Sequence, residues 1–318
     1  MDLIYTDAKR IDQGVLGAYS LDLSFGAKEN NFEMTLGSGE PVLEFGAFAY
    51  IEGTEYGGIV DAMHTVTDGE NITYKGRTWH GMLNSKIIQP DTGSDYFIVS
   101  GDANEVLALL IARLGLGSLF TASEAASGIT ISNYKFTRYC KAYDGIRAMM
   151  AAVNAKLRLV WQDQKIILSA EPIIDYTEDP IDGDTATLEV ERHEIKVNHL
   201  ICLGKGDLAE REVIHLYVDQ FGKMGDTQYF TGLDEVCDTY ENANSNDLRA
   251  DGLKRFAELR DNDTAKASVP ETDEFVYDIG DIVGATDIKS GVSVATAVTQ
   301  KIVRIQNGAV SVEYQIGS

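Results

Sequence analysis

Basic residues are scarce in this sequence. Its 318 residues include 27 lysines and arginines against 50 aspartates and glutamates, which gives a formal net charge of −23. Because nucleic-acid binding needs clustered Lys and Arg to neutralise phosphates, we expect no stable nucleic-acid partner. The same charge disfavours anionic membranes, and no apolar run approaches the ~20 residues that cross a bilayer, so no membrane partner is expected either.

Two further absences bear on the compartment in which the chain folds. The N-terminal segment MDLIYTDAKRIDQG lacks the basic stretch followed by an apolar stretch that marks a signal peptide. Only three cysteines occur, and Cys140, Cys202 and Cys237 are far apart, with none in a CxxC pair. This pattern argues against a disulfide framework or a zinc knuckle and predicts folding in a cytoplasm.

The motifs of the common enzyme classes are missing as well. The sequence has no GxSxG, no HExxH, no P-loop and no GxGxxG following a strand. Carboxylates are so abundant that no pair stands out as a general acid and base. We therefore expect no catalytic residues, no cofactor and no enzymatic activity.

Metal ligands are not patterned either. His193 and His199 are six residues apart in strand-like sequence, and polar residues on a strand face explain them better than a metal site does. The segment 238-DTYENANSND-247 lacks the glycine and the terminal glutamate of an EF-hand loop. No metal site is expected.

What the sequence does have is periodicity. In the first ~90 residues, apolar and polar residues alternate in short segments that glycines separate, as in 14-GVLGAYSLDLSFG-26 and 31-NFEMTLG-37. Asp68-Gly69 before 71-NITYKGRTWHGML-83 is typical of a hairpin. Short, evenly spaced strands of this kind predict an antiparallel barrel or sandwich.

The period changes near residue 100. Ser100 or Asp102 is expected to cap a helix over 103–114, and Asp144 to cap a second helix over 145–156. A strand at 128–139 and a hairpin over 157–170 complete this block. The mixture of both periods predicts a compact α+β domain inserted after the first strands.

The remaining sequence returns to strands. Segments within 186–222 are rich in Val, Ile, Leu and Tyr, and a helix is expected over 247–259. The chain then ends in strands, with Asn307-Gly308 as a hairpin turn. The predicted fold is thus mainly β, with two antiparallel barrels, an inserted α+β domain and a helical insert.

One of the two tryptophans lies in 76-GRTWHGMLNSKII-88. We predict a strand here, the last of the first barrel, which places Trp79 and Gly81 on one face and His80 on the other. Glycine as a neighbour leaves room for the indole to lie flat in a core. Trp79, Gly81 and Leu83 are the expected structural core residues, whereas replacing His80 by alanine is expected to change little.

Three stretches can be compared with known protein families: 76-GRTWHGMLNSKII-88 continuing into 95-DYFIVSGDANEVLALLIARL-114, then 197-VNHLICLGKGDLAEREVIHLYVD-219, and 277-YDIGDIVGATD-287 with its closing hairpin. They resemble the central hub proteins of phage tails, namely the T4-type baseplate hub and the N-terminal part of tail-associated (Tal) proteins of phages and prophages. The resemblance implies four parts: a first tail-tube-like barrel at 1–90, an inserted α+β domain at 91–182, a second barrel at 183–222 and 273–318, and an insertion at 223–272.

The resemblance also implies a function. Hub proteins of this kind form a homotrimeric ring with pseudo-sixfold symmetry that joins the tail tube and distal tail proteins to the spike or tip protein. The expected location is the virion tail tip, after synthesis in the cytoplasm of the bacterial host. The acidic charge suggests a lumen that repels DNA phosphates during passage. Since the sequence ends directly after the barrel hairpin, the spike or lysin is expected on a separate chain.

Two other classes of function stay open at this point. A tail-tip module could bind host-surface carbohydrate through the aromatic residues Tyr229, Phe230 and Tyr240, although packing or interface roles explain such residues better. A cell-wall hydrolase would need an acid–base pair or a metal triad in one pocket, and the sequence indicates neither. Individual interface residues are not identifiable from the sequence.

Overall fold

The computed structural model is mainly β, as the sequence predicts, and the residues that it describes form four α-helices, one more than expected. Among the residues it describes, no helix is long and apolar enough to span a membrane. The chain divides into two compact units, the smaller of which is Val190–Ala265. The described residues are 1–182, 187–191, 196–260, 264–270, 277–287, 289, 291–306 and 308–317.

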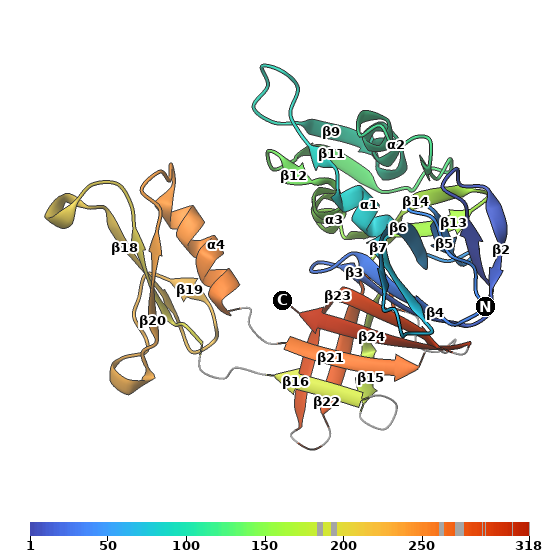
Figure 1. Cartoon of the computed structure of the whole chain (residues 1–318). Coiled ribbons are helices and arrows are strands. Elements are labelled where there is room, and N and C mark those ends of the chain that lie inside the picture. Colours follow the sequence, from blue (N-terminus) through green and yellow to red (C-terminus); the bar gives the residue numbers. More distant parts are fainter. Residues whose placement is uncertain are drawn as a thin grey trace. The chain divides into compact units, whose positions relative to one another are not determined.

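A large sheet organises the first unit (Figure 1). Its strand order is β16-β21-β24-β23-β3-β4-β7-β6-β5-β1-β2, with β22 on β23 and β15 on β22. The N-terminal strands are β1 (Leu3–Thr6), β2 (Asp12–Leu16), β3 (Tyr19–Gly26), β4 (Asn31–Leu36), β5 (Phe48–Tyr50), β6 (Gly57–Thr65) and β7 (Ile72–Thr78). The later strands are β15 (Asp175–Asp182), β16 (Thr187–Glu191), β21 (Thr264–Pro270), β22 (Ile282–Asp287), β23 (Val292–Gln306) and β24 (Ala309–Gly317).

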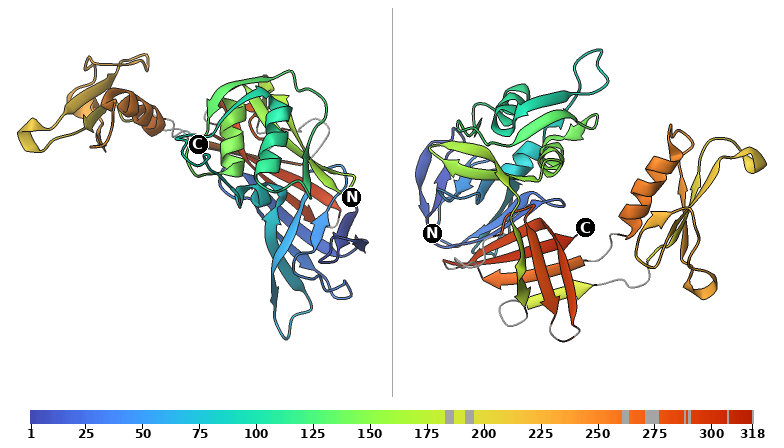
Figure 2. Two further views of the ribbon diagram at one scale, coloured as in Figure 1. Left: turned by 90° about the horizontal axis from the view of Figure 1, so that it is seen from above. Right: turned by 180° about the vertical axis from the view of Figure 1, so that it is seen from behind.

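The α+β part lies between these two groups of strands in the sequence. It contains α1 (Trp79–Asn84), β8 (Ile87–Ile88), β9 (Ile98–Asp102), α2 (Ala103–Arg113), β10 (Phe120–Ala122), β11 (Thr130–Lys135), β12 (Cys140–Lys141), α3 (Ala142–Ala151), β13 (Ala155–Gln162) and β14 (Lys165–Pro172). Figure 2 shows α2 and α3, drawn in green, next to one another. The antiparallel pair β13–β14 is the predicted hairpin, and β10 adds to it in parallel.

Of the two N-terminal helix caps that the sequence predicts, the structure confirms one and contradicts the other. Asp102 caps α2, because its carboxylate accepts a hydrogen bond from the Asn104 backbone N–H at 2.9 Å. Asp144 does not cap α3, which begins earlier, after Lys141, so that Asp144 lies in the first turn. A carboxylate there still favours the helix, since it faces the positive end of the helix dipole.

The second unit is a small sheet with one helix. Its elements are β17 (His199–Leu203), the 3₁₀ turn η1 (Leu208–Glu210), β18 (Val213–Val218), β19 (Met224–Gly225), η2 (Gly232–Asp234), β20 (Cys237–Glu241) and α4 (Leu248–Arg260). The strand order is β19-β18-β17-β20. Leu200, Cys202 and Leu216 form a buried core with Phe256 of α4. The helix covers this face of the sheet, so the small unit has an apolar core of its own.

This arrangement corrects one expected domain boundary. The sequence predicts that the segments of β17 and β18 belong to the second barrel, together with the C-terminal strands. They pair instead with β19 and β20 of the same small unit. The insertion thus begins near residue 190 rather than at 223. Alternation in a strand shows that one face is buried, but it carries no information on which strand lies alongside.

Candidate assembly surface

Strands from the two ends of the chain meet in the middle of the large sheet. β3 pairs with β23 in antiparallel register, with Leu23 opposite Val303 and Leu21 opposite Ile305. All four side chains are buried, with at most 1% of their surface exposed. The N-terminal strands and the C-terminal strands therefore form one continuous sheet, because ladder hydrogen bonds and a shared apolar face both cross the junction.

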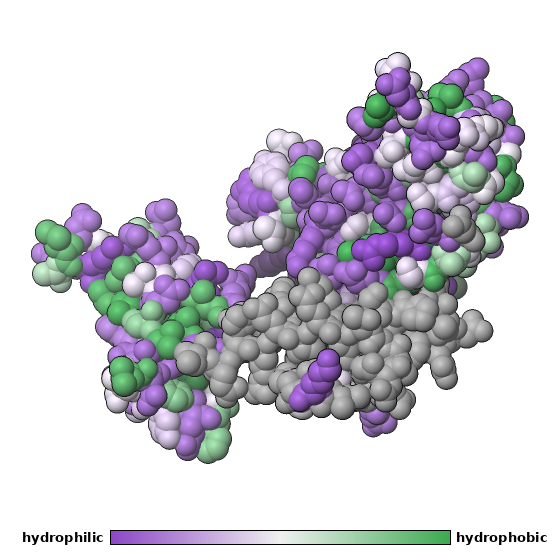
Figure 3. All heavy atoms as spheres, turned by 60° about the horizontal axis from the view of Figure 1, so that its bottom comes forward, coloured by the Kyte–Doolittle hydropathy of each residue, from purple (hydrophilic) through white to green (hydrophobic). Residues whose placement is uncertain are grey.

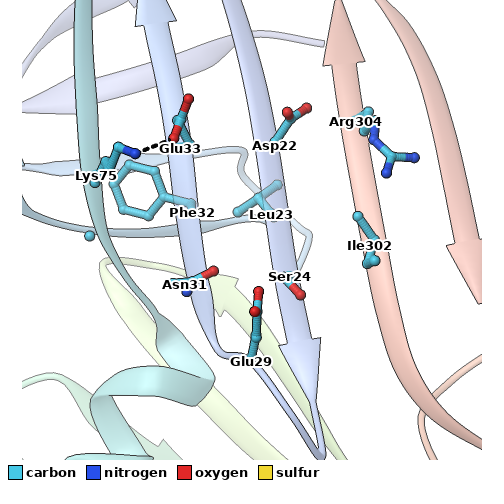
Figure 4. A pocket seen from close by; sticks show the side chains of 11 residues that line it. Asp22, Leu23, Ser24, Glu29, Asn31, Phe32, Glu33, Lys75, Ile302 and Arg304 are labelled. Carbon is cyan, nitrogen blue, oxygen red and sulfur yellow. Dashed lines mark ion pairs between the residues drawn. The ribbon is translucent and has the colours of Figure 1, made fainter. Parts of the chain in front are cut away.

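The opposite face of this junction is polar and open. Arg304, Asp22, Glu33 and Lys75 stand opposite one another on the adjacent strands β23, β3, β4 and β7. They border a shallow hollow of about 370 Å³ that Glu29 also lines (Figure 4). The sheet thus presents its polar side chains outward as a row that crosses from one half of the molecule to the other.

The charges along this row are unevenly placed. Lys75 is paired with Glu33, at 2.6 Å between Nζ and Oε2, and Arg304 with Glu313 of β24, at 3.1 Å. Asp22 and Glu33 are direct cross-strand neighbours of like charge, an arrangement that destabilises a sheet. The centre of the face is therefore acidic, with cations at its flanks.

A buried ion pair holds the two halves together under the sheet. Lys301 of β23 lies 2.8 Å from a carboxylate oxygen of Glu55, and His80 lies 3.5 Å from the other oxygen. Burial raises the pKa of Glu55, but the Lys301 ammonium and the His80 ring outweigh it and lower that pKa to about 2. Burial likewise opposes the charge on Lys301, yet Glu55 raises the pKa of Lys301 above its usual value. Both groups stay charged at neutral pH.

A second buried cluster fixes the α+β part to the C-terminal strands. Lys156 of β13 contacts Asp281 at 2.8 Å and Asp278 at 2.9 Å. Asp281 is fully buried and also accepts the backbone N–H of Ile174 at 2.9 Å. Burial lowers the pKa of Lys156, but hydrogen bonds to Asp281 and the charge of Asp278 raise it overall. Removing one partner would leave an unpaired buried charge, so this contact tolerates little change.

The Trp79 segment is a helix rather than the predicted strand. Residues Trp79–Asn84 form α1, which Thr78 caps by accepting a hydrogen bond from the Gly81 N–H. Trp79 and Leu83 are fully buried, and Trp79 stacks on Trp161 at 5.0 Å between ring centroids. Phe48 meets both indoles edge-on. The helix therefore places Trp79 between the N-terminal strands and the α+β part.

Two residues of this segment have roles that differ from those expected. A Cβ on Gly81 would lie 2.0 Å from the carbonyl oxygen of Asn30, so glycine allows α1 to approach the turn between β3 and β4. Glycine is not there to make room for Trp79. His80 is 2% exposed and stacks on Phe25 at 4.6 Å, so the structure leads us to expect that its replacement by alanine destabilises the fold.

The small unit holds a histidine pair that sequence spacing did not predict. His199 Nε2 lies 2.8 Å from His215 Nδ1, and His199 Nδ1 lies 2.6 Å from Glu235. Strand pairing between β17 and β18 brings these residues together although they are 16 positions apart, whereas His193 lies outside the described residues. Across the residues that the structure describes, no group of three or more His, Cys, Asp and Glu is arranged to hold a metal ion.

The three aromatic residues considered for carbohydrate binding do not form one site. Tyr229 and Phe230 meet edge-to-face at 5.1 Å, and Tyr229 is exposed. Tyr240 packs instead against the core under α4, among the partly buried side chains there. Only the first two are placed to meet a common ligand.

Comparison with known proteins places this geometry in a structural context. No protein-family model and no curated protein matches the chain in sequence. Among solved structures, the 43 kDa tail protein of prophage MuSo2 from Shewanella oneidensis is similar over 99% of this chain and 98% of its own, with TM-score 0.62 and 10% identity. A tail protein from Neisseria meningitidis MC58 is similar over 100% and 96%, with TM-score 0.54 and 13% identity.

A chain in the phage P2 baseplate, in its activated conformation, covers 99% of this chain and 98% of its own length, with TM-score 0.53 and 11% identity. At such low identities the similarity shows the fold. It extends over both units and both halves of the large sheet, because nearly every residue of each chain is included. The resemblance noted in the sequence is thus confirmed at the level of the fold: the chain has the fold of phage tail and baseplate proteins.

Proposed function

We propose that this protein is a structural hub of a phage or prophage tail tip. Three copies would form a ring with pseudo-sixfold symmetry that joins the tail tube and distal tail proteins to a spike or tip protein. The observation that carries the proposal is similarity to tail and baseplate proteins over the whole length of the chain. A closed ring of this kind requires one interface that repeats around the axis.

The continuity of the large sheet supports the ring. In a pseudo-sixfold ring of three chains, each chain must supply two similar segments of wall, and these segments must be joined without a gap. The pairing of β3 with β23 makes such a joint inside one chain. The buried ion pair of Glu55 with Lys301 adds a rigid link beneath it. The two segments would then form one continuous stretch of wall.

The polar face of that joint is the proposed lining of the lumen. Its centre carries Asp22, Glu29 and Glu33, and the chain as a whole carries a formal charge of −23. An acidic lining repels DNA phosphates, whereas a basic one would retain them. A function in DNA passage also accounts for the like-charged neighbours Asp22 and Glu33, which cost folding stability.

Electron microscopy of the chain with its neighbouring tail proteins tests the hub directly. Co-expression with the tail tube, distal tail and tip proteins, followed by negative-stain imaging, should give rings that contain three copies of this chain between tube and tip. Rings with six copies, or a location on the outside of the tube, would contradict the proposal.

The location of the acidic face has its own test in the same particles. A cysteine replacing Asp22, labelled with a gold cluster through maleimide after assembly, should place density inside the ring. The matched control is a cysteine replacing Glu124, which lies exposed in the α+β part away from the sheet face. Gold on the outer surface for the Asp22 position would refute the lumen assignment while leaving the hub intact.

A further inference from the structure

The small unit contains a pocket that the structural role does not use. It has a volume of about 400 Å³, within the range of roughly 300–1,000 Å³ that is usual for small-molecule sites. It lies beside the turn that joins β18 to β19 and the loop that contains η2. Its lining includes Asn198, Asp219, Gln220, Phe230, Leu233 and Arg260.

Several polar groups in this pocket are held in place while part of their hydrogen-bonding capacity stays free. Asp219 uses one carboxylate oxygen to accept the backbone N–H groups of Phe221 and Lys223, both at 2.9 Å. Gln220 is fixed through its oxygen, which accepts the Tyr229 hydroxyl at 2.7 Å. Within the described residues, the second Asp219 oxygen and the Gln220 amide N–H groups remain available to a ligand. Such preoriented donors and acceptors suit hydroxyl groups.

An aromatic wall and an apolar rim stand beside these polar groups. Phe230 is half-buried and braced edge-to-face by Tyr229 at 5.1 Å, so its ring is held in position. Leu233 lines the pocket with a side chain that is 103% exposed. Figure 3 shows green apolar patches on the surface of this unit. An aromatic face beside fixed polar groups matches a ligand with one apolar face and a hydroxylated edge.

The charges in the pocket select against ionic ligands. Lys196 and Arg260 are balanced by Asp219 and Asp234, so the lining is neutral although the chain is strongly acidic. Arg260 is partly engaged, because one of its guanidinium N–H groups donates to the Val197 carbonyl at 2.6 Å. Because positive and negative side chains are equal in number in this lining, it offers no net attraction to an ionic ligand of either sign, and an uncharged ligand suits it best.

We propose that this pocket binds a neutral saccharide, whose apolar face packs on Phe230 and whose hydroxyl groups bond to Asp219, Gln220 and Asp234. A protein segment is the less favoured ligand, because the groups converge in a hollow rather than along a flat patch. The site belongs to the small unit alone. Saccharide binding therefore adds to the structural role without depending on it.

The test uses the full chain and defined sugars. Saturation-transfer NMR is run with maltotriose, galactotriose, triacetylchitotriose and a rhamnose trisaccharide, and calorimetry follows for those that respond. We expect at least one to bind, and Phe230→Ala to weaken that binding about tenfold or more, since an aromatic contact of this size contributes over 1 kcal/mol. Phe221→Ala is the matched control, because Phe221 is 84% exposed and does not line the pocket. It should bind as the unaltered chain does.

A second variant separates loss of sugar binding from misfolding, in case Phe230→Ala does not fold. Asp234→Asn changes an exposed carboxylate and should weaken binding without a change in the circular dichroism spectrum. The proposal is overturned if none of the four sugars binds, if Phe230→Ala and Phe221→Ala have equal effects, or if anionic 3′-sialyllactose binds more tightly than the neutral sugars. Ring formation is measured separately by microscopy, so failure of either proposal leaves the other to be judged by its own result.

Discussion

Trp79 lies in a cluster of buried aromatic side chains. Its indole is fully buried, stacks on Trp161 and meets Phe48 edge-on, so it connects the N-terminal strands with the α+β part. We expect Trp79→Ala to lower the free energy of unfolding by about 3–5 kcal/mol, because it leaves a large cavity. Guanidinium denaturation followed by circular dichroism measures this. Phe45→Ala, at a side chain that is 62% exposed, should change stability by less than about 1 kcal/mol.

Glu55 gives the protein a predictable response to acid. Its folded pKa of about 2 lies below its ordinary value of 4.5, so its paired carboxylate stabilises the fold fully above about pH 4.5. That stabilisation is lost as the pH falls towards 2, where the carboxylate becomes protonated in the folded state. Glu55→Gln should therefore be much less stable than the unaltered chain at pH 6, by about 3–5 kcal/mol, because Lys301 is left unpaired. The difference should shrink between pH 4.5 and 2.5.

Urea denaturation at a series of pH values provides the measurement for Glu55. The control is Glu124→Gln, which removes an exposed carboxylate and should differ from the unaltered chain by a small amount at every pH. A stability difference for Glu55→Gln that grows as the pH falls would mean that the Glu55 carboxylate does not stabilise the fold.

The same residues show how far the sequence predicts this site. The sequence predicts that Trp79 lies in the core, because a glycine neighbour leaves room for the indole. The burial of His80 is not predictable from the sequence, because it depends on Glu55 and Phe25, which lie more than 20 positions away. Nor could it identify Lys301 as a core residue. A lysine is normally exposed, and only the distant carboxylate of Glu55 makes its burial tolerable.

At the scale of elements, local sequence signals predict the helices and hairpins well, but they do not predict which strands pair with one another. The helices over 103–114 and 247–259 and the hairpins over 157–170 and 299–316 agree with α2, α4, β13–β14 and β23–β24. Each depends on neighbours within a few residues, through caps, periodicity or a turn. The assignment of β17 and β18 to the C-terminal strands was wrong, because partner choice depends on contacts between distant segments.

Helix α1 shows a second limit of predicting secondary structure from sequence. Six residues are too few for helical periodicity to be distinguished from strand alternation, and Gly81 disfavours a helix by intrinsic propensity. Packing overrides that propensity, because the glycine lets α1 lie against the backbone at Asn30.

A single methyl group at Gly81 tests the importance of this contact. The added Cβ of Gly81→Ala would lie 2.0 Å from the Asn30 carbonyl oxygen, so α1 must shift away from the β3–β4 turn. We expect a loss of about 1–3 kcal/mol, typical of overpacking, although alanine favours a helix. Gly117→Ala is the matched control, since a Cβ there meets nothing within 4 Å. Thermal denaturation compares the two, and equal melting temperatures would show that α1 does not need its close approach.

At the scale of the whole molecule, the net negative charge of each chain opposes the assembly of several copies. Copies of a chain with a formal charge of −23 repel one another, whatever apolar contacts their interface contains. Salt weakens that repulsion, since the Debye length falls from about 10 Å at 0.1 M to about 3 Å at 1 M. Apolar contacts do not weaken in the same way. A ring of identical chains should therefore assemble more readily as salt is added.

Light scattering on a sizing column makes this a measurable prediction. The chain has a mass of 34.8 kDa, so three copies have a mass of about 104 kDa. We expect the trimer fraction at a fixed protein concentration to rise between 0.05 M and 0.5 M sodium chloride, and the mid-point of assembly to move to lower protein concentration. A trimer that dissociates on addition of salt would show that ion pairs between copies outweigh their net repulsion. The acidic residues would then belong to the interface rather than to the lumen.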